Sequence, residues 1–396
     1  MTAVPPSRGR PSPKERDRSP PVAWPPIAIA APAFPPPRLS PAFTAARVTA
    51  IIVSYNTRGL LKRCLESLLP EIAPGDVDVV VVDNGSRDGS AELLRHDFPW
   101  VRLVESSVNL GFGGANNTVL RQLDTPYALL LNSDTEVLPG AIRALLGCME
   151  RHPRAGAVGC RLLNPDGSLQ RSCWRFPTPA GQLAEAVGIS RLLRRQADYA
   201  DWDFATERPV DFAIGACLLL RAAALCQVDL FDERFFLYAE ETDLCRRLSY
   251  HGWQTWYTPD GSVIHRGGAS GSVHTGIQFL NAQSLYFQKW YGQRGLAVLR
   301  LSHLVRAVVR IAIYGAATLI RPGSRYGKRL PGQAALLRWA LRPDAGRMPA
   351  PLGSCAVVTS SVPAGRAAIG VPATTRLRPE VAHLIKSGYP AVGGEP

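Results

Sequence analysis

The sequence has 396 residues, 46% of them hydrophobic, and a formal net charge of +13. This length allows one full catalytic domain with extensions and excludes a single small module. Residues 1–46 contain 6 basic and 2 acidic residues, residues 294–396 contain 15 and 3, and residues 47–293 contain 24 and 27. The near-neutral centre argues against a nucleic-acid groove. The basic ends favour attachment to an anionic surface such as phospholipid, and tails that only aid solubility are the alternative.

Residues 1–46 are rich in proline and charge, so we expect a disordered arm without the unbroken apolar run of a signal peptide. The eight cysteines show no CxxC pair and no metal-finger spacing. We interpret them as reduced, mostly buried thiols of a cytosolic protein. The sequence therefore predicts a cytoplasmic protein whose order begins at Val48.

From Val48 onward, apolar runs of strand length alternate with helical patterns. Strands without polar alternation are buried on both faces, and their alternation with helices is typical of a mainly parallel, doubly wound α/β sheet. The expected strands are 48–54, 77–82, 101–104 and 127–131, and the expected helices are 60–69, 90–98, 114–123 and 140–152. A less regular half follows, with a strand at 212–221, a helix at 240–251 and strands at 254–258 and 262–265.

Polar or glycine-rich turns follow each of the first four strands. Because ligands bind beyond the carboxyl ends of strands in such sheets, the turns indicate one nucleotide site. Asp83 is placed to accept hydrogen bonds from a base or ribose, whereas the glycine-rich segment 109–117 alone is a weak signal. The residues of this predicted site are Ser54, Asn56, Asp83, Asn84, Ser86, Asn109, Gly111, Phe112, Asn117, Asn132, Ser133 and Asp134.

Asp134 follows a very apolar strand, where a carboxylate can bridge a divalent cation to a diphosphate. A capping aspartate in a strand-to-helix turn explains the residue equally well. His265 ends another apolar strand and suits a further metal ligand, although a lone histidine is more often structural. We expect Mg²⁺ or Mn²⁺ as the cofactor, with Asp134 and His265 as its ligands.

The acidic run 240–243 opens the helix expected at 240–251, where acidic residues ordinarily stabilise the helix dipole. Asp243 can also pair with Arg247 one turn later. Glu241 instead shares a helix face with Leu244, so its carboxylate should point inward. A partly desolvated carboxylate has a raised pKa and suits a general base.

A further group of residues is assigned to the acceptor or to phosphate. The segment 171–177 carries arginines that can face phosphates, and an exposed basic loop is an equal alternative. The glycine-rich loop after His265 is able to close over a phosphate. The group comprises Arg171, Arg175, Gly215, Ala216, Glu240, Asp243 and Ser270.

Residues 294–330 contain eight basic and no acidic residues around an apolar stretch. Arginines interrupt that stretch, so a membrane-spanning helix is not expected. A helix here would have one basic and one broad apolar face, typical of an interfacial helix on anionic lipid. A helix that covers the catalytic domain, with its arginines in solvent, is the alternative. We divide the chain into an arm (1–46), a catalytic domain (47–293), a basic amphipathic helical extension (294–345) and a low-complexity tail (346–396).

Eight motifs occur in order between Val48 and Tyr291: IIVSYNTRGLLKRCLESL, VVVVDNGSRDGS, NLGFGGANN, LLLNSDTEV, LQRSCWRFPT, GACLLLRA, FDERFFLYAEETDLCRRLSYHGW and VIHRGGASG. Together they resemble glycosyltransferase family 2, with its GT-A fold, and in particular the rhamnosyltransferase-like branch. The resemblance implies an inverting, metal-dependent transferase that moves a rhamnose-like sugar from a dTDP- or UDP-linked donor. The implied acceptor is a glycan or lipid-linked hydroxyl in cell-envelope polysaccharide synthesis, at the inner face of the plasma membrane.

The same resemblance implies roles for single residues. Asp83 would contact the base or ribose, Asn132 and Asp134 would occupy the DXD position, Glu241 would be the general base, and His265 would help hold metal and diphosphate. Asn132 departs from the acidic residue of that motif, which weakens the expected metal site. Glu241 stands where aspartate is commoner, which changes only the reach of the base.

Two other functions remain open from the sequence. A nucleotidyltransferase acting on sugar phosphates also uses such a sheet and a bound metal, but it would need a glycine-rich basic loop after the first strand, which 54–57 is not. A catalytically inactive protein that binds nucleotide sugars or carbohydrate is the other alternative. The presence of Glu241, Asp134 and His265 argues against it.

Overall fold

The computed structural model describes residues 47–72, 76–188, 199, 202–267, 275–321, 325–342 and 358–360. The expected arm at 1–46, most of the expected tail and Ser270 lie outside the described residues.

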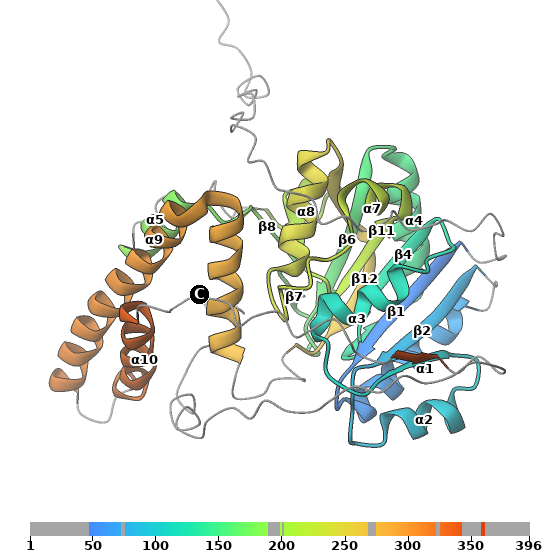
Figure 1. Ribbon diagram of the computed structural model, residues 1–396, viewed down its shortest axis with the longest axis horizontal. Coiled ribbons are helices and arrows are strands. Elements are labelled where there is room, and N and C mark those ends of the chain that lie inside the picture. Colours follow the sequence, from blue (N-terminus) through green and yellow to red (C-terminus); the bar gives the residue numbers. More distant parts are fainter. Residues whose placement is uncertain are drawn as a thin grey trace, which may run out of the picture. The chain divides into compact units, whose positions relative to one another are not determined.

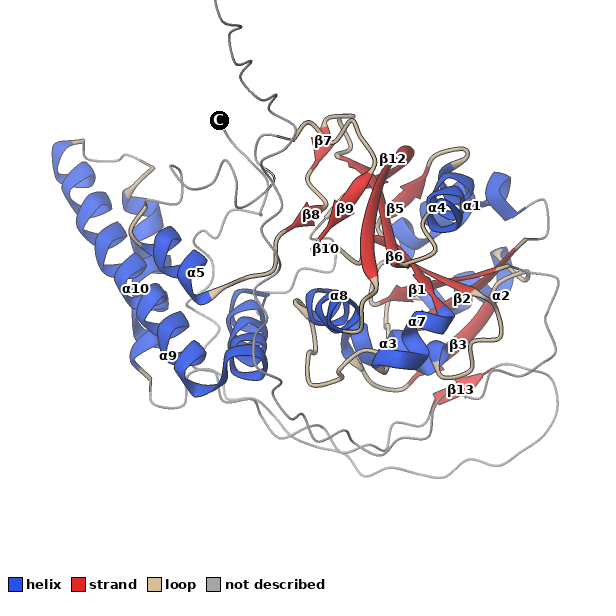
Figure 2. Ribbon diagram, turned by 90° about the horizontal axis from the view of Figure 1, so that it is seen from above, coloured by secondary structure: helices blue, strands red, loops and turns tan. Residues whose placement is uncertain are grey.

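Parallel strands form one half of the central sheet (Figures 1 and 2). They run in the order β3 (Arg102–Ser106), β2 (Val77–Asp83), β1 (Val48–Ser54) and β4 (Tyr127–Asn132). In the other half, β11 (Cys217–Arg221) lies antiparallel between β4 and β6 (Ala155–Leu163), β12 (Gln254–His265) is parallel to β6, and β5 (Thr135–Val137) pairs with β12. The prediction of a mainly parallel α/β sheet is confirmed.

Helices cover both faces of the sheet, as Figure 2 shows. Neighbouring residues of β1 point to opposite faces, so Ile52 packs in one apolar core and Ile51 in the other. Residues of α1 (Arg58–Ile72), α2 (Ser90–Asp97) and α4 (Ala141–Arg151) share the core of Ile52. Residues of α3 (Gly111–Leu120), α7 (Ala222–Val228) and α8 (Glu240–Tyr250) share that of Ile51.

Two expectations about strands in the second half are wrong. The strand expected at 212–221 is broken into β10 (Phe212–Ala213), which pairs with β8 (Cys173–Trp174), and β11 of the central sheet. The break lies at Gly215 and its neighbours. The two strands expected at 254–258 and 262–265 are one strand, β12, whose register shifts after Thr258. Shorter strands flank it: β7 (Leu169–Gln170) pairs with β6, and β9 (Arg208–Val210) pairs with β12.

The C-terminal helices begin earlier than expected. The helix α9 spans Thr275–Ile320, so the boundary expected at 293/294 falls inside it, next to Gly292, whose φ of 64° and ψ of −162° interrupt the helix. A short 3₁₀ turn (Gly327–Arg329) leads to α10 (Leu330–Leu341). Leu280, Ala307 and Leu336 share one buried cluster, so both limbs of α9 pack with α10. Within the expected tail, β13 (Val358–Ser360) pairs with β3.

Two arginines of the second limb of α9 do not lie free in solvent. Arg306 donates to Glu185 Oε1 of α5 (Pro179–Ala186) at 3.2 Å, and Arg300 donates to the carbonyl of Ala340 at 3.2 Å. This corrects the expectation of a helix with all its arginines in solvent. Among the described residues, no helix combines the length and the apolar character needed to cross a membrane.

Candidate active site

The ends of three parallel strands bring the predicted site residues together. Ser54 is paired in register with Asp83, and Val53 with Asn132, so the residues that end β1, β2 and β4 meet at one edge of the sheet. This is the edge at which ligands bind in open α/β sheets. The topology thus gathers residues that are far apart in the sequence.

A chain of hydroxyl groups joins the turn after β1 to the turn after β4. Ser54 Oγ lies 3.0 Å from Thr57 Oγ1, which lies 2.8 Å from Ser133 Oγ. All three side chains are buried. These bonds therefore hold Ser133, and with it the neighbouring Asp134, at a fixed position relative to β1.

The turns after β1 and β2 are also tied to each other. The Asn56 amide N–H donates to Ser86 Oγ at 3.0 Å, and Asn56 Oδ1 accepts from the N–H of Arg87 at 2.8 Å. Asp83 Oδ1 accepts from the N–H of Ser86 at 3.1 Å. Burial raises the pKa of Asp83, and the bonds from Ser86 offset part of this effect. Asp83 thus lies in a turn that is held in place by hydrogen bonds to the turn after β1 and within itself.

Asn84 holds the glycine-rich loop. Its Nδ2 donates to Asn109 Oδ1 at 3.0 Å and to the carbonyl of Gly111 at 3.1 Å, and its Oδ1 accepts from the N–H of Leu110 at 2.8 Å. Asn109 Oδ1 in turn accepts from the N–H of Gly111 at 2.9 Å. Asn84 is buried and positions the loop, and both of its amide hydrogens are used, so it has no donor left for the nucleotide contact expected from the sequence.

Asn117 requires a similar correction. Its Nδ2 donates to the carbonyl of Phe231 and to Glu233 Oε1, both at 2.9 Å, and its Oδ1 accepts from the N–H of Phe231 at 3.0 Å. The side chain is 1% exposed. Asn117 therefore clamps the segment before α8 to α3 and offers no donor to a nucleotide.

The glycine loop touches the turn that leads into α8. A Cβ atom on Gly111 would come within 2.2 Å of the carbonyl oxygen of Phe236, and Gly111 has a φ of +75°. The N–H of Phe112 donates to the same oxygen at 2.9 Å. Tyr238 and Ala239, the two residues before α8, have φ values of 74° and 65°. Consecutive left-handed residues without glycine store strain, and such strain occurs most often at functional sites.

Two adjacent carboxyl groups begin α8. Burial raises the pKa of Glu241, although backbone N–H groups of Gly215, Glu241 and Thr242 donate to its carboxylate and offset part of the effect. Burial raises the pKa of Glu240 strongly, and repulsion from Glu241 adds to it. Glu240 Oε2 has no hydrogen-bond partner within the described residues. The pair can hold one proton on Glu240 and leave Glu241 as the ionised, half-buried base.

Asp243 does not belong to the acceptor or phosphate group. It is fully buried, and its carboxylate accepts from Arg247 Nε at 2.8 Å, Lys289 Nζ at 2.8 Å and Trp290 Nε1 at 2.9 Å. The expected pairing with Arg247 is present. The structure therefore corrects the assignment of Asp243, which anchors the first limb of α9 to α8.

The other residues of that group are dispersed. Gly215 supplies its N–H to Glu241, as described above, and the carbonyl of Ala216 accepts from the N–H of Asn132 at 3.0 Å, so both act through their backbone. Arg171 and Arg175 are exposed, and the Arg175 guanidinium lies 4.9 Å from the ring centre of Tyr199.

Asp134 and His265 come together beside the end of β4. His265 Nε2 lies 3.4 Å from Asp134 Oδ1, and both side chains are about nine-tenths buried. His265 Nδ1 lies 2.7 Å from Gln170 Oε1. Gln170 Nε2 donates to Asn164 Oδ1 at 2.9 Å and to the carbonyl of His265 at 3.1 Å, which fixes the orientation of the amide. His265 Nδ1 therefore donates to Gln170 Oε1, and the other ring nitrogen, Nε2, is turned towards Asp134.

This donor set fits a divalent cation. An imidazole nitrogen and a carboxylate oxygen face each other at 3.4 Å, close to the separation of two ligands in one coordination shell. The Asn132 amide nitrogen also lies 3.4 Å from His265 Nε2, and Asn132 adds no charge. One carboxylate and one imidazole suit Mg²⁺ or Mn²⁺ when diphosphate oxygens complete the shell. Gln170 was not found from the sequence, because a glutamine in a short strand has no distinctive pattern.

Comparisons with known proteins give one family model and several relatives. The family model described as glycosyl transferase family 2 matches residues 49–200. An N-acetylglucosaminyl-diphospho-decaprenol L-rhamnosyltransferase of Mycobacterium tuberculosis is 36% identical over 235 residues, which cover 54% of this chain and 74% of that protein. The rhamnosyltransferase WbbL of Escherichia coli is 26% identical over 228 residues, which cover 55% and 83%. A solved mannosyltransferase, PcManGT from Pyrobaculum calidifontis with GDP-Man and Mn²⁺, is 19% identical with a TM-score of 0.44, covering 74% and 85%.

Proposed function

Because the chain belongs to glycosyltransferase family 2 and is a glycosyltransferase with a GT-A fold, we propose that it transfers a sugar with inversion from a nucleotide diphosphate donor to an acceptor hydroxyl. The observation that carries this proposal is the facing pair of Asp134 and His265 at the strand ends, 3.4 Å apart. In this proposal Asp134 and His265 hold Mg²⁺ or Mn²⁺. The cation supplies a positive charge that neutralises the departing diphosphate, so no general acid is needed.

The residues of the chain supply the remaining chemistry. Asp83 accepts hydrogen bonds from the base or ribose in a turn that Ser86 and Asn56 keep ordered. The Glu241 carboxylate takes the proton of the acceptor hydroxyl, whose oxygen forms a bond to the anomeric carbon. The bond between that carbon and the diphosphate oxygen breaks on the opposite side. A single displacement of this kind inverts the anomeric configuration.

The names of the relatives support a choice of substrates. The relative from Mycobacterium tuberculosis is named for L-rhamnose and for an N-acetylglucosaminyl-diphospho-decaprenol acceptor, and WbbL is named as a rhamnosyltransferase. For this chain we accordingly propose a rhamnose-like donor that is dTDP- or UDP-linked. The proposed acceptor is a glycan or lipid-linked sugar in cell-envelope polysaccharide synthesis.

The second limb of α9 supports attachment to the membrane surface on which such an acceptor would lie. Within 301–320, all of which the structure describes, every exposed residue is Leu, Val, Ile or Ala. Residues 294–342 contain ten basic and no acidic residues. The end of this limb combines both features, because Leu319 and Ile320 are 84% and 78% exposed and are followed by the exposed cations Arg321 and Arg325. An apolar face next to cations suits anionic lipid at the inner face of the plasma membrane.

A transfer assay tests the proposal. The full chain is incubated with Mn²⁺, a panel of dTDP- and UDP-linked sugars and a synthetic N-acetylglucosaminyl-diphospho-prenol, and the anomeric configuration of the product is determined by NMR. We expect transfer with inversion from a rhamnose donor, and loss of transfer with a chelator. Retention of configuration, or transfer that a chelator does not diminish, would contradict the mechanism.

A further inference from the structure

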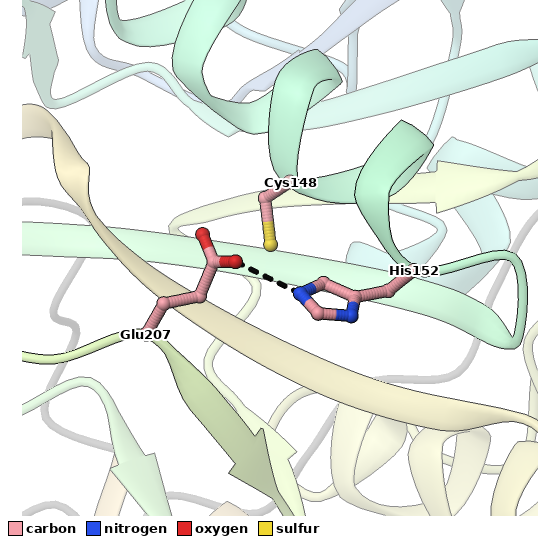
Figure 3. A group of neighbouring side chains, drawn as sticks. All are labelled: Cys148, His152 and Glu207. Atoms are coloured by element: carbon pink, nitrogen blue, oxygen red, sulfur yellow. Dashed lines mark hydrogen bonds and ion pairs between the residues drawn. The ribbon is translucent and has the colours of Figure 1, made fainter.

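A second group of metal-ligating side chains lies at the C-terminal end of α4 (Figure 3). Cys148 and His152 are four residues apart, so one helix face presents both to the same side. Glu207, just before β9, faces them from another part of the chain. The ligand atoms of the three side chains all lie within 4.8 Å of one another, and Figure 3 shows them converging.

This group is distinct from the site at Asp134. His152 stacks on Trp256, with ring centres 3.4 Å apart and planes inclined by 10°. Trp256 lies near the start of β12, whereas His265 ends that strand. Along β6, the partner of Trp256 is Val158 and the partner of Ile264 is Leu163, and five residues of extended strand span roughly 17 Å. The two groups therefore lie at opposite ends of β12.

The chemistry of the group differs as well. We propose that Cys148, His152 and Glu207 form a binding site for a Zn²⁺-type transition-metal ion that joins the end of α4 to the segment entering β9. Thiolate and imidazole ligands favour such ions over Mg²⁺, which takes oxygen ligands. On binding, the Cys148 thiol gives its proton to solvent, His152 Nε2 gives to solvent the proton that it now donates to Glu207 while Nδ1 carries the ring hydrogen, and Glu207 donates one carboxylate oxygen.

The present contacts of Glu207 leave room for this rearrangement. Its Oε1 lies 2.8 Å from His152 Nε2, and its Oε2 accepts from Arg151 at 2.6 Å. Two ligands at tetrahedral Zn²⁺ are roughly 3.3 Å apart, so His152 and Glu207 need to separate by only about half an ångström. Arg151 is half exposed and already lies 3.8 Å from Asp260, so its charge can move to that carboxylate.

Co²⁺ tests the proposal, because it takes the same ligands as Zn²⁺ and absorbs in the near ultraviolet only when a thiolate is bound. The full chain is reduced, freed of metal and titrated with Co²⁺ without oxygen. We expect one equivalent to produce the thiolate band and Zn²⁺ to abolish it. A protein without the band would show that the group is only a hydrogen-bonded ion pair, which would overturn the proposal.

Matched variants locate the site. Cys148→Ser should remove the band, and Glu207→Gln should weaken Co²⁺ binding at least tenfold. Cys226→Ser should leave the band unchanged, since Cys226 is the only cysteine of the described residues that is not buried and is therefore the most accessible competing thiol. Asp134→Asn should leave it unchanged too, which separates this site from that of the proposed transfer reaction. Glu207 lies near the surface, so Glu207→Gln should fold and can test the site even if Cys148→Ser fails to fold. A band that survives Cys148→Ser, or that Cys226→Ser removes, would refute the assignment.

Discussion

Nε2 of His265 and Oδ1 of Asp134 face each other at 3.4 Å. Gln170 sets this arrangement, because its amide is oriented by its bonds to Asn164 and to the His265 carbonyl, so that its Oε1 accepts the hydrogen of Nδ1 and the other ring nitrogen, Nε2, is turned towards Asp134. Gln170 is thus a positioning residue for the proposed metal site.

Changing Gln170→Leu should weaken binding of Mn²⁺. The residue that receives the other ring N–H of a metal-bound histidine typically changes metal affinity by about 10- to 100-fold. Electron paramagnetic resonance of free Mn²⁺, in the presence of a nucleoside diphosphate, measures the effect. Gln122→Leu is the matched control, because Gln122 is exposed. Equal affinity in the two variants would remove Gln170 from this role.

Glu241→Gln should abolish transfer while donor binding survives, because the amide cannot accept the acceptor proton. Glu240→Gln should retain activity, since Glu240 is buried and its raised pKa favours the protonated form, which glutamine imitates. Initial rates and calorimetric donor binding measure the two effects. Near-normal turnover of Glu241→Gln, or a greater loss of activity in Glu240→Gln, would show that Glu241 is not the base.

The pH profile of the wild-type enzyme provides an independent check. The base must be ionised, so kcat/KM should fall as the pH decreases through the pKa of Glu241. Burial raises that pKa above the ordinary glutamate value of 4.5. The acid limb should therefore lie above 4.5 and should be absent from the residual rate of Glu241→Gln. An acid limb below the ordinary value would contradict the burial argument.

Stability should depend on pH through Glu240. Its pKa is raised in the folded protein, so the folded state binds the proton more tightly than the unfolded chain. The resulting stabilisation is complete below the unfolded pKa and is lost as the pH rises towards the folded pKa. Glu240→Gln lacks this dependence. As the pH rises, the variant should therefore become more stable relative to the wild type, and the difference between their free energies of unfolding should grow by at most about 1.4 kcal/mol per pH unit. Urea unfolding between pH 5 and about pH 8 measures the difference. If the stabilities of the wild type and of Glu240→Gln change in parallel with pH, Glu240 is ionised in the folded protein.

The first half of the fold could be predicted from the sequence because its strands are unbroken apolar runs. The strand expected at 48–54 is β1 to the residue. The second half could not, because its breaks depend on tertiary contacts. Gly215 lies against the ring of Phe112, and β12 continues through the proline, aspartate and glycine after Thr258 because β6 pairs with it on both sides of the irregularity.

The site was predictable to a similar degree. Asp83 and Asp134 follow apolar strands, and topology alone brings strand ends together. The roles of Asn84 and Asn117 could not be foreseen, because their partners lie up to 116 residues away in the sequence and a side-chain amide has no pattern that separates ligand binding from loop support. Cys148 and His152 were missed for a related reason. Their third partner, Glu207, is 55 residues beyond His152.

Gly111→Ala should disturb both the glycine loop and the turn before α8. The new Cβ would meet the Phe236 carbonyl oxygen at 2.2 Å, and a left-handed φ costs a non-glycine residue about 1–2 kcal/mol besides. Gly140→Ala separates the two effects, because Gly140 has a φ of +82° but no described atom within 4 Å of its added Cβ. We expect Gly140→Ala to show only the strain, and Gly111→Ala to lose more stability and most of the transfer activity. Equal losses in urea unfolding would show that the contact with Phe236 is unimportant.

The end of α9 should determine binding to anionic vesicles. Replacing Leu319 and Ile320 together by Asp removes two exposed apolar side chains from the proposed lipid contact and adds negative charge beside Arg321. Burying one such side chain contributes about 1.5–3 kcal/mol, so sedimentation with vesicles that contain anionic phospholipid should weaken by at least about tenfold. The matched control is Leu341→Asp, an apolar position that is 62% exposed and lies at the other end of α10, near Arg300. Wild-type binding should also fall as salt is raised, since the cations contribute through screened attraction. Vesicle binding that the double variant retains, or that Leu341→Asp reduces equally, would place the membrane contact elsewhere on the protein.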